Sequence, residues 1–425
     1  MGITLFIAFV VLIMLSVPIS IALGLSSMIA VLLHTDLSLM VVVQKIFGGV
    51  NSFTLMAIPF FILAGNIMAA GGVSNRLVNF ASSLIGRVTG GLALVSTIAC
   101  TFFGAISGSA PATTAAIGAV MVDPMEKKGY SKEFAAATVA ASGTIGLLIP
   151  PSITMVLYGV ISGVSIGKLF LAGIIPGLLM CCTLMLVEYV ISKKRGYRGE
   201  EPASFNDIIS SFKKSILALL MPLIILGGIY GGIFTPTEAA VVAVVYGLII
   251  GLFVYKELNI KKIFKILQDS GKSTSVILYL VATAHIFSYI LASEEIPQQL
   301  ATFLLSVSDN PLIIQFMIMI ALLIAGTFLD NAVAIVLLTP IFYPIIAQVG
   351  IDPVFFGVLM VFALAVGQIT PPVGLCLFVS CNISKLSIEK LSKAIVPFLI
   401  ALIALLIVLN LIPDAILFIP RHAVF

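Results

Sequence analysis

The sequence predicts an all-α polytopic membrane protein made of two inverted repeats, each with a re-entrant helical hairpin and a broken helix. Three observations support this prediction. The composition is strongly apolar, the apolar runs are long enough to cross a bilayer, and a pair of prolines recurs at a fixed offset. A helical membrane protein with internal inverted symmetry is typical of secondary transporters.

The composition excludes a soluble domain. The chain has 425 residues, of which 60% are hydrophobic and 9% charged, and its mean hydropathy is +1.24. Soluble domains are about 45–50% apolar and about 25% charged. Apolar runs near 3–33, 216–255 and 391–411 match or exceed the roughly 20 residues of a spanning helix, whereas barrel strands are short and alternating. The five cysteines form no CxxC pair, so no zinc site or disulfide framework is indicated.

Two proline pairs interrupt apolar segments at equivalent places. GLLIPPSI occupies 146–153 and GQITPPVG occupies 367–374, an offset of 221 residues (371 minus 150). At the same offset Gly129 matches Gly350 and Phe134 matches Phe355. An interior proline removes a backbone donor and clashes with the preceding turn, which is costly in hydrocarbon. We therefore predict an internal repeat with broken helices at 131–162 and 353–383.

Each repeat also holds an apolar run that is too long for one crossing. The run near 88–122 contains GAISGSAPATT (104–114), and the run near 312–347 contains GTFLDNA (326–332). The apolar arms on either side of these small or polar centres are shorter than the roughly 20 residues of a full crossing. Non-helical backbone at that depth is tolerated where it is buried in protein or lines a cavity. Both runs are predicted to be re-entrant hairpins.

The placement of Lys and Arg predicts the orientation. The basic loops, KKRGYR with Lys213 and Lys214 and the stretch 256–272, fall on one side, and the loop with Glu294 and Glu295 falls on the other. By the positive-inside rule the N-terminus is predicted to be cytoplasmic and the C-terminus periplasmic. The crossings behind this count are 3–33, 53–70, 131–162, 168–192, 215–234, 237–255, 273–292, 353–383 and 391–413.

Five crossings separate the two repeats, so the first hairpin should enter from the cytoplasm and the second from the periplasm. The predicted units are the first repeat (1–192), a cytoplasmic basic linker (193–214) and the second repeat (215–425). Amphipathic pieces near 35–50, 72–86, 256–271 and 295–307 are expected to lie along the membrane surface. Glu188, beside the basic loop, is expected at the interface.

The breaks themselves point to function. A broken helix exposes N–H groups at one half-helix end and carbonyl oxygens at the other, which makes an anion site and a cation site without a buried charge for each. Inverted repeats with paired hairpins and broken helices describe a secondary transporter whose site lies near the bilayer midplane. The freed backbone groups are therefore predicted to bind ions and substrate.

Several segments in a fixed order resemble one family. These are PFFILAGN (59–66), GAISGSAPATTAAIG, GLLIPPS, FTPTEAA (234–240), FLDN and GQITPPVG. Together they resemble the large membrane (M) subunit of tripartite ATP-independent periplasmic (TRAP) transporters of the bacterial inner membrane. The resemblance implies a non-enzymatic, Na⁺-coupled elevator-type carrier of a small organic acid, with sialic acid and C4-dicarboxylates both open. It also implies two partners, a small four-helix membrane subunit, expected as a separate chain, and a periplasmic substrate-binding protein.

The resemblance further implies two Na⁺ sites, whose oxygen-rich ligands would suit a hard cation. The first would combine the first hairpin tip with carbonyls of the first break: Ser107, Gly108, Ser109, Gly143, Ile145, Leu148 and Pro150. The second would combine the second tip with the second break: Gly326, Thr327, Asp330, Asn331, Gly367, Thr370 and Pro371. Asp330 is the one acid placed at a tip, where a buried charge is costly unless paired, so it is the leading candidate. The alternative is an interfacial helix cap.

Substrate is expected between the two tips. The candidate contacts are Ser107, Ser109, Thr113, Ser152, Asn331 and Thr370, although Ser and Thr also commonly cap or pack helices. Two other functions stay open. One is a stand-alone Na⁺- or H⁺-coupled organic anion symporter of the same architecture. The other is an intramembrane hydrolase using Ser107 and His285, which lie in different repeats with no third partner implied.

Overall fold

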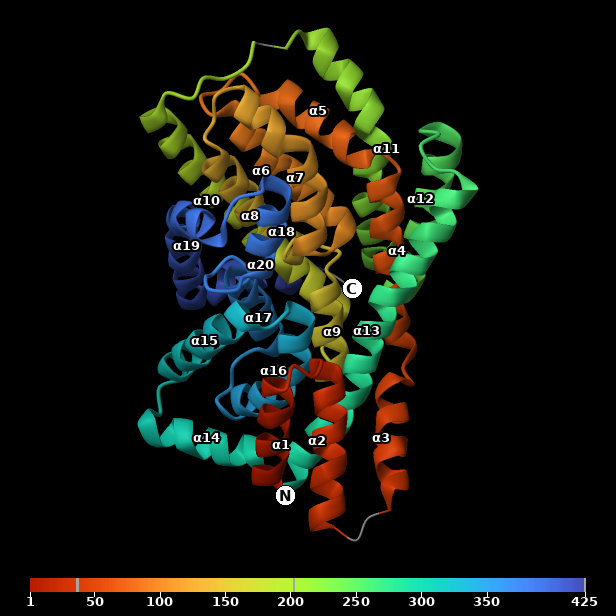
Figure 1. The fold of residues 1–425 in the computed structure, drawn as a ribbon, viewed down its shortest axis with the longest axis vertical. Helices are drawn as coiled ribbons and strands as arrows, with labels where there is room; N and C mark the ends of the chain where they lie inside the picture. The colour runs from red at the N-terminus through yellow and green to blue at the C-terminus, as the bar shows by residue number, and fades with distance from the viewer. Residues whose placement is uncertain (36–37, 202, 424–425) are drawn as a thin grey trace.

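The computed structural model describes residues 1–35, 38–201 and 203–423, and the fold is all-helical over these residues. Eight helices in the described ranges are long and apolar enough to cross a membrane by length and composition. Figure 1 shows helices stacked along one long axis, with hairpins and broken helices on one side and a long slanting helix on the other. The all-α prediction is confirmed.

The first repeat contains the predicted hairpin and broken helix. The hairpin consists of α6 (Gly91–Ser107) and α7 (Ala110–Lys127). The broken helix consists of α8 (Lys132–Gly143), a short 3₁₀ turn η2 (Thr144–Leu147) and α9 (Ile153–Ser162). Gly108 ends α6 at φ +60°, a left-handed conformation that glycine adopts without a steric penalty. The helical hairpin and the helix break are confirmed as elements, and the re-entrant position of the hairpin stays a prediction.

The second repeat has the same elements in the opposite orientation. Its hairpin is α15 (Pro311–Phe328) and α16 (Asn331–Gln348), and its broken helix is α17 (Pro353–Gly367) and α18 (Leu375–Ser384). In Figure 1 the first hairpin rises to the end of the molecule where α5 lies, whereas α15 and α16 lie toward the end where the N-terminus lies. The two repeats are therefore inverted, as the sequence predicts.

The two repeats interlock around a shared core. α18 packs against α7 and α8, and α9 packs against α16. The Ser380 hydroxyl donates to the carbonyl of Ala136 at 2.7 Å, and the Tyr158 hydroxyl donates to the carbonyl of Pro353 at 2.8 Å. We call this unit the hairpin body. It comprises α6 to α9 and α15 to α18, together with α10 (Ile166–Arg195), α19 (Ile388–Leu411) and α20 (Pro413–His422).

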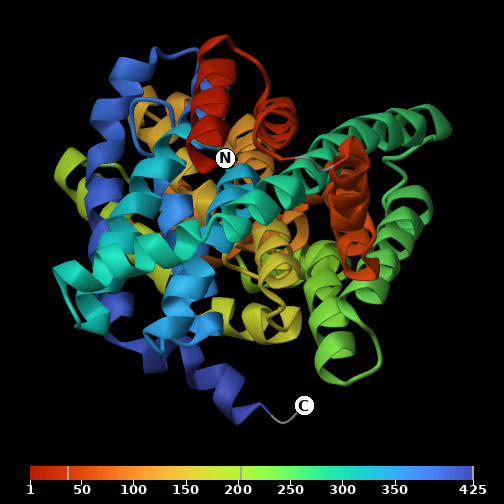
Figure 2. The same ribbon diagram turned by 90° about the horizontal axis from the view of Figure 1, so that it is seen from below.

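A second group of helices, the outer frame, borders the hairpin body. Its longest member is α13 (Ile260–Ser293), which slants across the molecule in Figures 1 and 2 and packs against α2, α3 and α4. The frame comprises α1 (Gly2–Met14), α2 (Ile19–His34), α3 (Leu39–Val50), α4 (Ala57–Ala70), α11 (Phe205–Tyr230), α12 (Pro236–Ile249) and α13, with short turns at Phe53–Met56 and Ile250–Val254. α4 and α13 also contact the hairpin body.

Three of the four amphipathic pieces become separate helices. They are α3, α5 (Val73–Ile85) and α14 (Ile296–Val307), although residues 36 and 37 of the first piece lie outside the described residues. The fourth prediction is wrong, because most of 256–271 forms the first turns of α13. Most of the predicted basic linker (193–214) is also helical, since α10 continues to Arg195 and α11 begins at Phe205.

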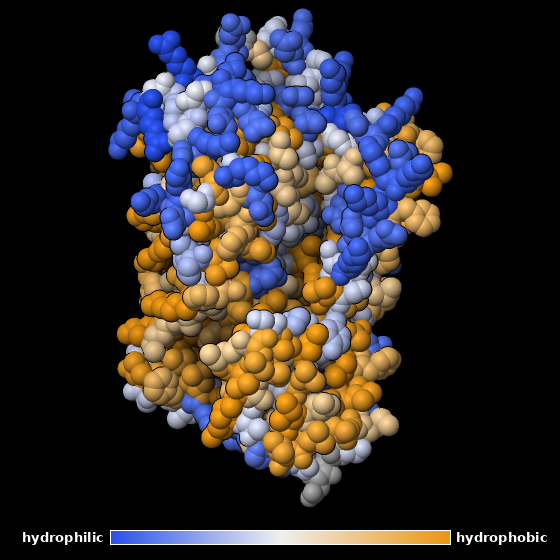
Figure 3. All heavy atoms as spheres, viewed as in Figure 1, coloured by the Kyte–Doolittle hydropathy of each residue, from blue (hydrophilic) through white to orange (hydrophobic). Residues whose placement is uncertain are grey.

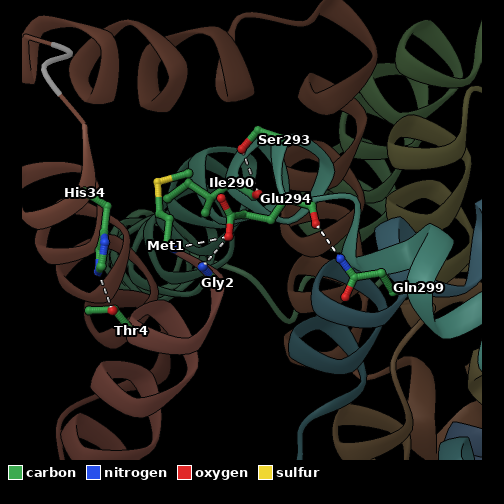
Figure 4. Close-up of polar contacts among 8 residues, drawn as sticks. All are labelled: Met1, Gly2, Thr4, His34, Ile290, Ser293, Glu294 and Gln299. Atoms are coloured by element: carbon green, nitrogen blue, oxygen red, sulfur yellow. Dashed lines mark hydrogen bonds and ion pairs between the residues drawn. The ribbon is translucent and has the colours of Figure 1, made fainter.

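The N-terminal apolar run is two helices rather than one crossing. The sequence predicts a single span over 3–33, but Ser16 adopts a positive φ of 63° and Pro18 precedes α2, so the chain reverses between α1 and α2. The Thr4 hydroxyl lies 2.6 Å from Nε2 of His34, which joins the start of α1 to the end of α2 (Figure 4). The pair is therefore an antiparallel hairpin.

The antiparallel hairpin of α1 and α2 changes the predicted position of the N-terminus. Figure 4 shows the Met1 ammonium and the Gly2 N–H both facing the carboxylate of Glu294, at 3.2 Å and 2.8 Å. The prediction that the N-terminus and the Glu294 loop lie on opposite sides of the membrane is therefore wrong. The cause is that 3–33 was counted as one crossing instead of a hairpin, which moves the predicted N-terminus to the other side of the membrane.

Charge is distributed unevenly between the two ends. Figure 3 shows hydrophilic residues gathered over the end where α5, α7 and the start of α11 lie, and apolar side chains over much of the rest. Lys128 pairs with Glu200 at 3.8 Å, and Arg195 donates to the hydroxyl of Ser131 at 2.9 Å. We call this end the basic end. Glu294 lies at the opposite end, at the far end of α13.

Candidate ion and substrate site at the hairpin tips

The first hairpin tip gathers oxygen atoms. Ser107 and Thr113 hydroxyls lie 2.8 Å apart, and the Thr113 hydroxyl also donates to the carbonyl of Ser109 at 2.8 Å. Ser109 is the N-cap of α7, and its own hydroxyl accepts from the N–H of Ala112 at 3.5 Å. The tip is therefore held by hydrogen bonds among its own hydroxyl and backbone groups.

The first break lies directly against this tip. The backbone N–H of Ile153 donates to the carbonyl of Gly108 at 3.3 Å. A Cβ on Gly104 would lie 2.6 Å from Cα of Gly146, so only glycine allows the hairpin and the break to approach this closely. The first predicted site thus unites two segments that are distant in sequence.

The carbonyls predicted for the first site do not all face the tip. The carbonyl of Ile145 already accepts from the N–H groups of Leu148 and Ile149, at 2.9 and 3.0 Å. The carbonyl of Leu148 lies against Gly173 of α10. Gly143 lies against the side chain of Thr114, whose buried hydroxyl also faces the Cys376 thiol. Sequence reasoning missed Thr114 as an oxygen beside the break, although it lies in the quoted motif.

The second tip repeats the arrangement with a charged cap. Asp330 is the N-cap of α16, and its carboxylate accepts from the N–H of Ala332 at 2.9 Å. Asp330 is an exposed residue, although neighbouring groups of the protein surround most of its carboxylate. The carbonyl of Thr327 accepts from the N–H of Gly374 at 3.2 Å. A capping role is thus visible, and the carboxylate remains partly open to a ligand.

The second break approaches its tip as closely as the first. A Cβ on Gly367 would lie 2.5 Å from Cα of Gly326. The hydroxyl of Thr370 donates back to the carbonyl of Val366 at 2.8 Å, within its own turn. Pro371–Pro372, like Pro150–Pro151 in the first break, is a cis peptide. Two residues predicted for the second site, Gly326 and Gly367, are therefore in close contact.

Two buried amide side chains add polar groups near the second tip. Asn331 is 2% exposed, and neither of its amide atoms has a partner among the described residues. Gln368 was not predicted, although it stands inside the motif GQITPPVG. Its Oε1 accepts from the Cys376 thiol at 3.2 Å, and its Nε2 has no described partner. A buried amide without a partner is costly, so these groups are candidates for a ligand.

The predicted substrate contacts differ in accessibility. Ser109 and Thr370 are partly exposed. Ser107, Thr113, Ser152 and Asn331 are buried, and the Ser152 hydroxyl is held by Thr154 at 2.8 Å and by the N–H of Met155 at 3.3 Å. Thr113 and Ser152 are thus occupied as structural hydrogen-bonding groups. His285 borders a cavity elsewhere, and no hydrogen bond joins it to Ser107 among the described residues.

Two cavities lie at the boundary between the hairpin body and the outer frame. One of about 400 Å³ lies between α9 and α16 on one side and α3 and α13 on the other. The other, of about 470 Å³, lies between the α9–α10 loop and the turn that precedes α12. None of the predicted substrate residues lines either cavity. The space at the tips is therefore distinct from these cavities.

The sequence matches one family along nearly its whole length. Residues 6–415 match the family described as Tripartite ATP-independent periplasmic transporter, DctM component. An isethionate TRAP transporter permease of Oleidesulfovibrio alaskensis is 45% identical over 406 residues, which are 95% of this chain. The chain spans 64% of that relative's length.

Two further relatives match over most of both chains. A C4-dicarboxylate TRAP transporter large permease of Pseudomonas aeruginosa is 41% identical over 94% of each chain. A sialic acid TRAP transporter large permease of Vibrio cholerae is 41% identical over 89% of this chain and 88% of its own. Among solved structures, the YdaH transporter of Alcanivorax borkumensis has a TM-score of 0.69 at 15% identity, covering 92% of this chain and 91% of its own. That likeness concerns the fold alone.

Proposed function

The chain belongs to the DctM component family of tripartite ATP-independent periplasmic transporters, and from this membership we propose that it is the large transmembrane subunit of a Na⁺-driven importer. It is a transport permease rather than an enzyme. The importer takes up a small organic acid from a periplasmic binding protein, and the hairpin body moves through the membrane as an elevator.

The elevator mechanism is supported by the division of the molecule into the hairpin body and the outer frame. Both hairpin tips and both breaks belong to one interlocked unit, joined by contacts such as Ser380 to Ala136 and Tyr158 to Pro353. The outer frame lies beside this unit and contacts it through α4 and α13, and cavities of about 400 and 470 Å³ lie along the boundary. A unit that holds the whole site can move as a rigid body against its neighbour.

The proposed Na⁺ sites use the two tips. At the first, Ser107 and Ser109 lie beside the break, and Thr114 adds a hydroxyl next to Gly143. At the second, Asp330 supplies a carboxylate and Asn331 a buried amide oxygen. Hydroxyl, carbonyl, amide and carboxylate oxygens are the ligands that hard cations prefer. The observation that carries the proposal is the close approach of each tip to the break of its own repeat.

The proposed substrate is a small organic anion. The relatives' names specify isethionate, a C4-dicarboxylate and sialic acid, which differ in size but share an acidic group. No Lys or Arg occurs in the tip and break motifs, so helix N-termini, bound Na⁺ and the amides of Asn331 and Gln368 would hold the acid. Sialic acid is the first substrate to test.

Partners and orientation follow from the family and from the charge. We propose a small four-helix membrane subunit and a periplasmic substrate-binding protein as partners, in the bacterial inner membrane. The positive-inside rule assigns the basic end to the cytoplasm. Glu294 and the N-terminus, at the opposite end, are then periplasmic. α19 begins near Lys390 and Lys393 and crosses once, which puts the start of α20 on the periplasmic side.

The decisive experiment is uptake of labelled sialic acid into proteoliposomes that hold this chain and its small partner. A Na⁺ gradient is applied with and without the binding protein. Uptake that requires both would support the proposal. Uptake that needs no binding protein would favour a stand-alone symporter, and failure with sialic acid, C4-dicarboxylates and isethionate alike would contradict the proposed transport function.

A further inference from the structure

Glu188 is a buried acid on α10, with 0% exposure. Its predicted position at the membrane interface is wrong, because α6, α8 and α19 pack against α10 and enclose it. The hydroxyls of Thr97 and Ser142 are hydrogen-bonded to its carboxyl Oε1. A neutral carboxyl can donate to such a hydroxyl, and none of the three residues lines the cavities of about 470, 400, 350 and 210 Å³ in the described part of the chain. Packing within the hairpin body therefore explains this cluster.

A second polar cluster surrounds a cavity at the basic end. The cavity has a volume of about 350 Å³ and lies between the turn that joins α7 to α8 and the loop that follows α10. We call it the basic-end cavity. Six of its lining residues are charged or aromatic: Lys128, Tyr130, Arg195, Tyr197, Arg198 and Glu200. By contrast, neither cavity at the boundary with the outer frame is lined by Lys, Arg, Asp or Glu.

The loop after α10 is packed closely against its neighbours, although it is short and polar. The N–H of Glu200 donates to the carbonyl of Gly86 at 2.8 Å. A Cβ on Gly199 would lie 2.2 Å from the carbonyl oxygen of Arg87, so the close approach of the two backbones requires glycine. The loop is therefore bonded to the residues that join α5 to α6.

Two tyrosines connect this loop to the turn between α7 and α8. The ring centroids of Tyr130 and Tyr197 lie 4.4 Å apart. The N–H of Ser131 donates to the Tyr197 hydroxyl at 3.0 Å, and the Tyr130 hydroxyl donates to the carbonyl of Arg198 at 3.4 Å. The two walls of the basic-end cavity are thus bonded to each other.

Positive charges outnumber negative charges around the cavity. Lys128, Arg195 and Arg198 supply three positive charges, and Glu200 supplies one negative charge. The Glu200 carboxylate accepts from the Ser82 hydroxyl at 2.8 Å and lies 3.8 Å from the ammonium of Lys128. Three minus one leaves an excess of two positive charges in the lining.

The two arginines keep hydrogen-bond donors for a ligand. Arg195 donates to the Ser131 hydroxyl at 2.9 Å, which uses one of its five N–H groups. Arg198 takes part in none of the ion pairs among the described residues. A guanidinium group presents its donors in a planar fork that matches phosphate and carboxylate. The excess charge and these donors indicate that the cavity binds an anion.

We propose that the basic-end cavity binds a phosphate group. Phosphate carries up to two negative charges at neutral pH, which balances the excess charge, and its several acceptor oxygens suit Lys128, Arg195 and Arg198, which belong to two different loops. The source is a soluble phosphate compound or a lipid headgroup, since the cavity lies at the hydrophilic end of the molecule (Figure 3). The inference goes beyond the proposed function, because it assigns an anion site away from the hairpin tips.

The test titrates the purified full chain with inorganic phosphate in a phosphate-free detergent buffer and measures binding by calorimetry. Arg198→Gln and Lys128→Gln should each lower the affinity about tenfold, which corresponds to about 1.4 kcal/mol for a lost charge-assisted contact. Lys194→Gln and Lys127→Gln are the matched controls, because each is exposed, lies at the same end and does not line the cavity. Both controls should bind phosphate as wild type does.

Gly199→Ala tests the shape of the cavity, because it keeps every charge. The added Cβ would lie 2.2 Å from the carbonyl oxygen of Arg87, so the loop has to move. Phosphate affinity should again fall about tenfold. The midpoint of thermal unfolding without phosphate shows whether each variant is folded, and if Gly199→Ala is not, the four charge variants decide.

Native mass spectrometry with added phosphatidic acid distinguishes the two sources. One bound lipid fewer in Arg198→Gln than in Lys194→Gln would identify a lipid headgroup, and equal lipid counts together with the expected phosphate titrations would identify a soluble phosphate compound. Binding of neither inorganic phosphate nor phosphatidic acid by wild type would overturn the proposal. Equal losses of phosphate affinity in Arg198→Gln and Lys194→Gln would also overturn it, because they would show only a general attraction to a basic surface. None of these measurements uses Na⁺ or uptake, so failed uptake would contradict the proposed function alone.

Discussion

The backbone N–H of Ile153 donates to the carbonyl of Gly108 at 3.3 Å, so the second half of the first broken helix is tied to the first hairpin tip. The second repeat has a matching bond from Gly374 to Thr327 at 3.2 Å. The two donors are 221 residues apart (374 minus 153), the offset that relates the proline pairs. The repeats therefore share a contact as well as a sequence pattern.

Gly104→Ala should destabilise the hairpin body. The added Cβ would lie 2.6 Å from Cα of Gly146, and backbone cannot move away as a flexible side chain can. We expect a loss of about 1–3 kcal/mol, read as a lower midpoint of thermal unfolding in detergent. Gly227→Ala is the matched control, because it is also helical and has nothing within 4 Å of its added Cβ. Equal midpoints for the two variants would contradict the close approach.

Asp330→Asn separates charge from capping. Asn caps a helix about as well as Asp, so the hydrogen bond from Ala332 survives and stability should change little. The lost charge should weaken Na⁺ binding, and the Na⁺ concentration for half-maximal uptake should rise at least tenfold. Asp330→Ala should lose both properties, with a further cost of about 1 kcal/mol in stability. If Asp330→Asn transports with unchanged Na⁺ dependence, Asp330 is a cap and the second site needs another ligand.

The sequence predicts the repeats well because their signals are local. Proline pairs inside apolar runs and polar tips inside long hairpins leave visible marks at a constant spacing. Gly108 and Ser109 are predicted at the first hairpin tip for the same reason, since each stands in a short motif.

Other features depend on contacts between distant residues. Thr97 and Ser142 are separated from Glu188 by 91 and 46 residues, so no local pattern could reveal that this acid is enclosed. Pro18 is a local signal for the chain reversal between α1 and α2. The apolar residues on both sides of it nevertheless led to the prediction of a single crossing. Because this reversal was not predicted, the N-terminus was predicted on the side of the membrane opposite to Glu294, with which it pairs.

Tyr158→Phe should weaken the link between the two broken helices. The Tyr158 hydroxyl donates to the carbonyl of Pro353 at 2.8 Å, and the side chain is fully buried. Without it the carbonyl of the half-buried Pro353 loses one partner, at a cost of about 1 kcal/mol. Tyr255→Phe is the control, since its hydroxyl donates to the carbonyl of Lys214 in an exposed position, where water can replace it. Thermal unfolding should therefore shift in the first variant only, and similar shifts in both would argue against a buried link.

Glu294 should anchor the start of α1 in a pH-dependent way. It lies just beyond the end of α13, and the N–H of Gly2 and the Met1 ammonium lower its pKa below the ordinary value of a glutamate. A lowered pKa in the folded state means that the contact contributes fully above the ordinary pKa and is lost as the pH falls through the lowered one. Hydrogen exchange of the first turn of α1, corrected for the intrinsic pH dependence of exchange, should show protection that declines over that acidic range. In Glu294→Gln the protection should be weak at every pH, while Glu295→Gln, next to it and exposed, should behave as wild type. A Glu294→Gln variant that keeps the acidic decline would assign it to another group.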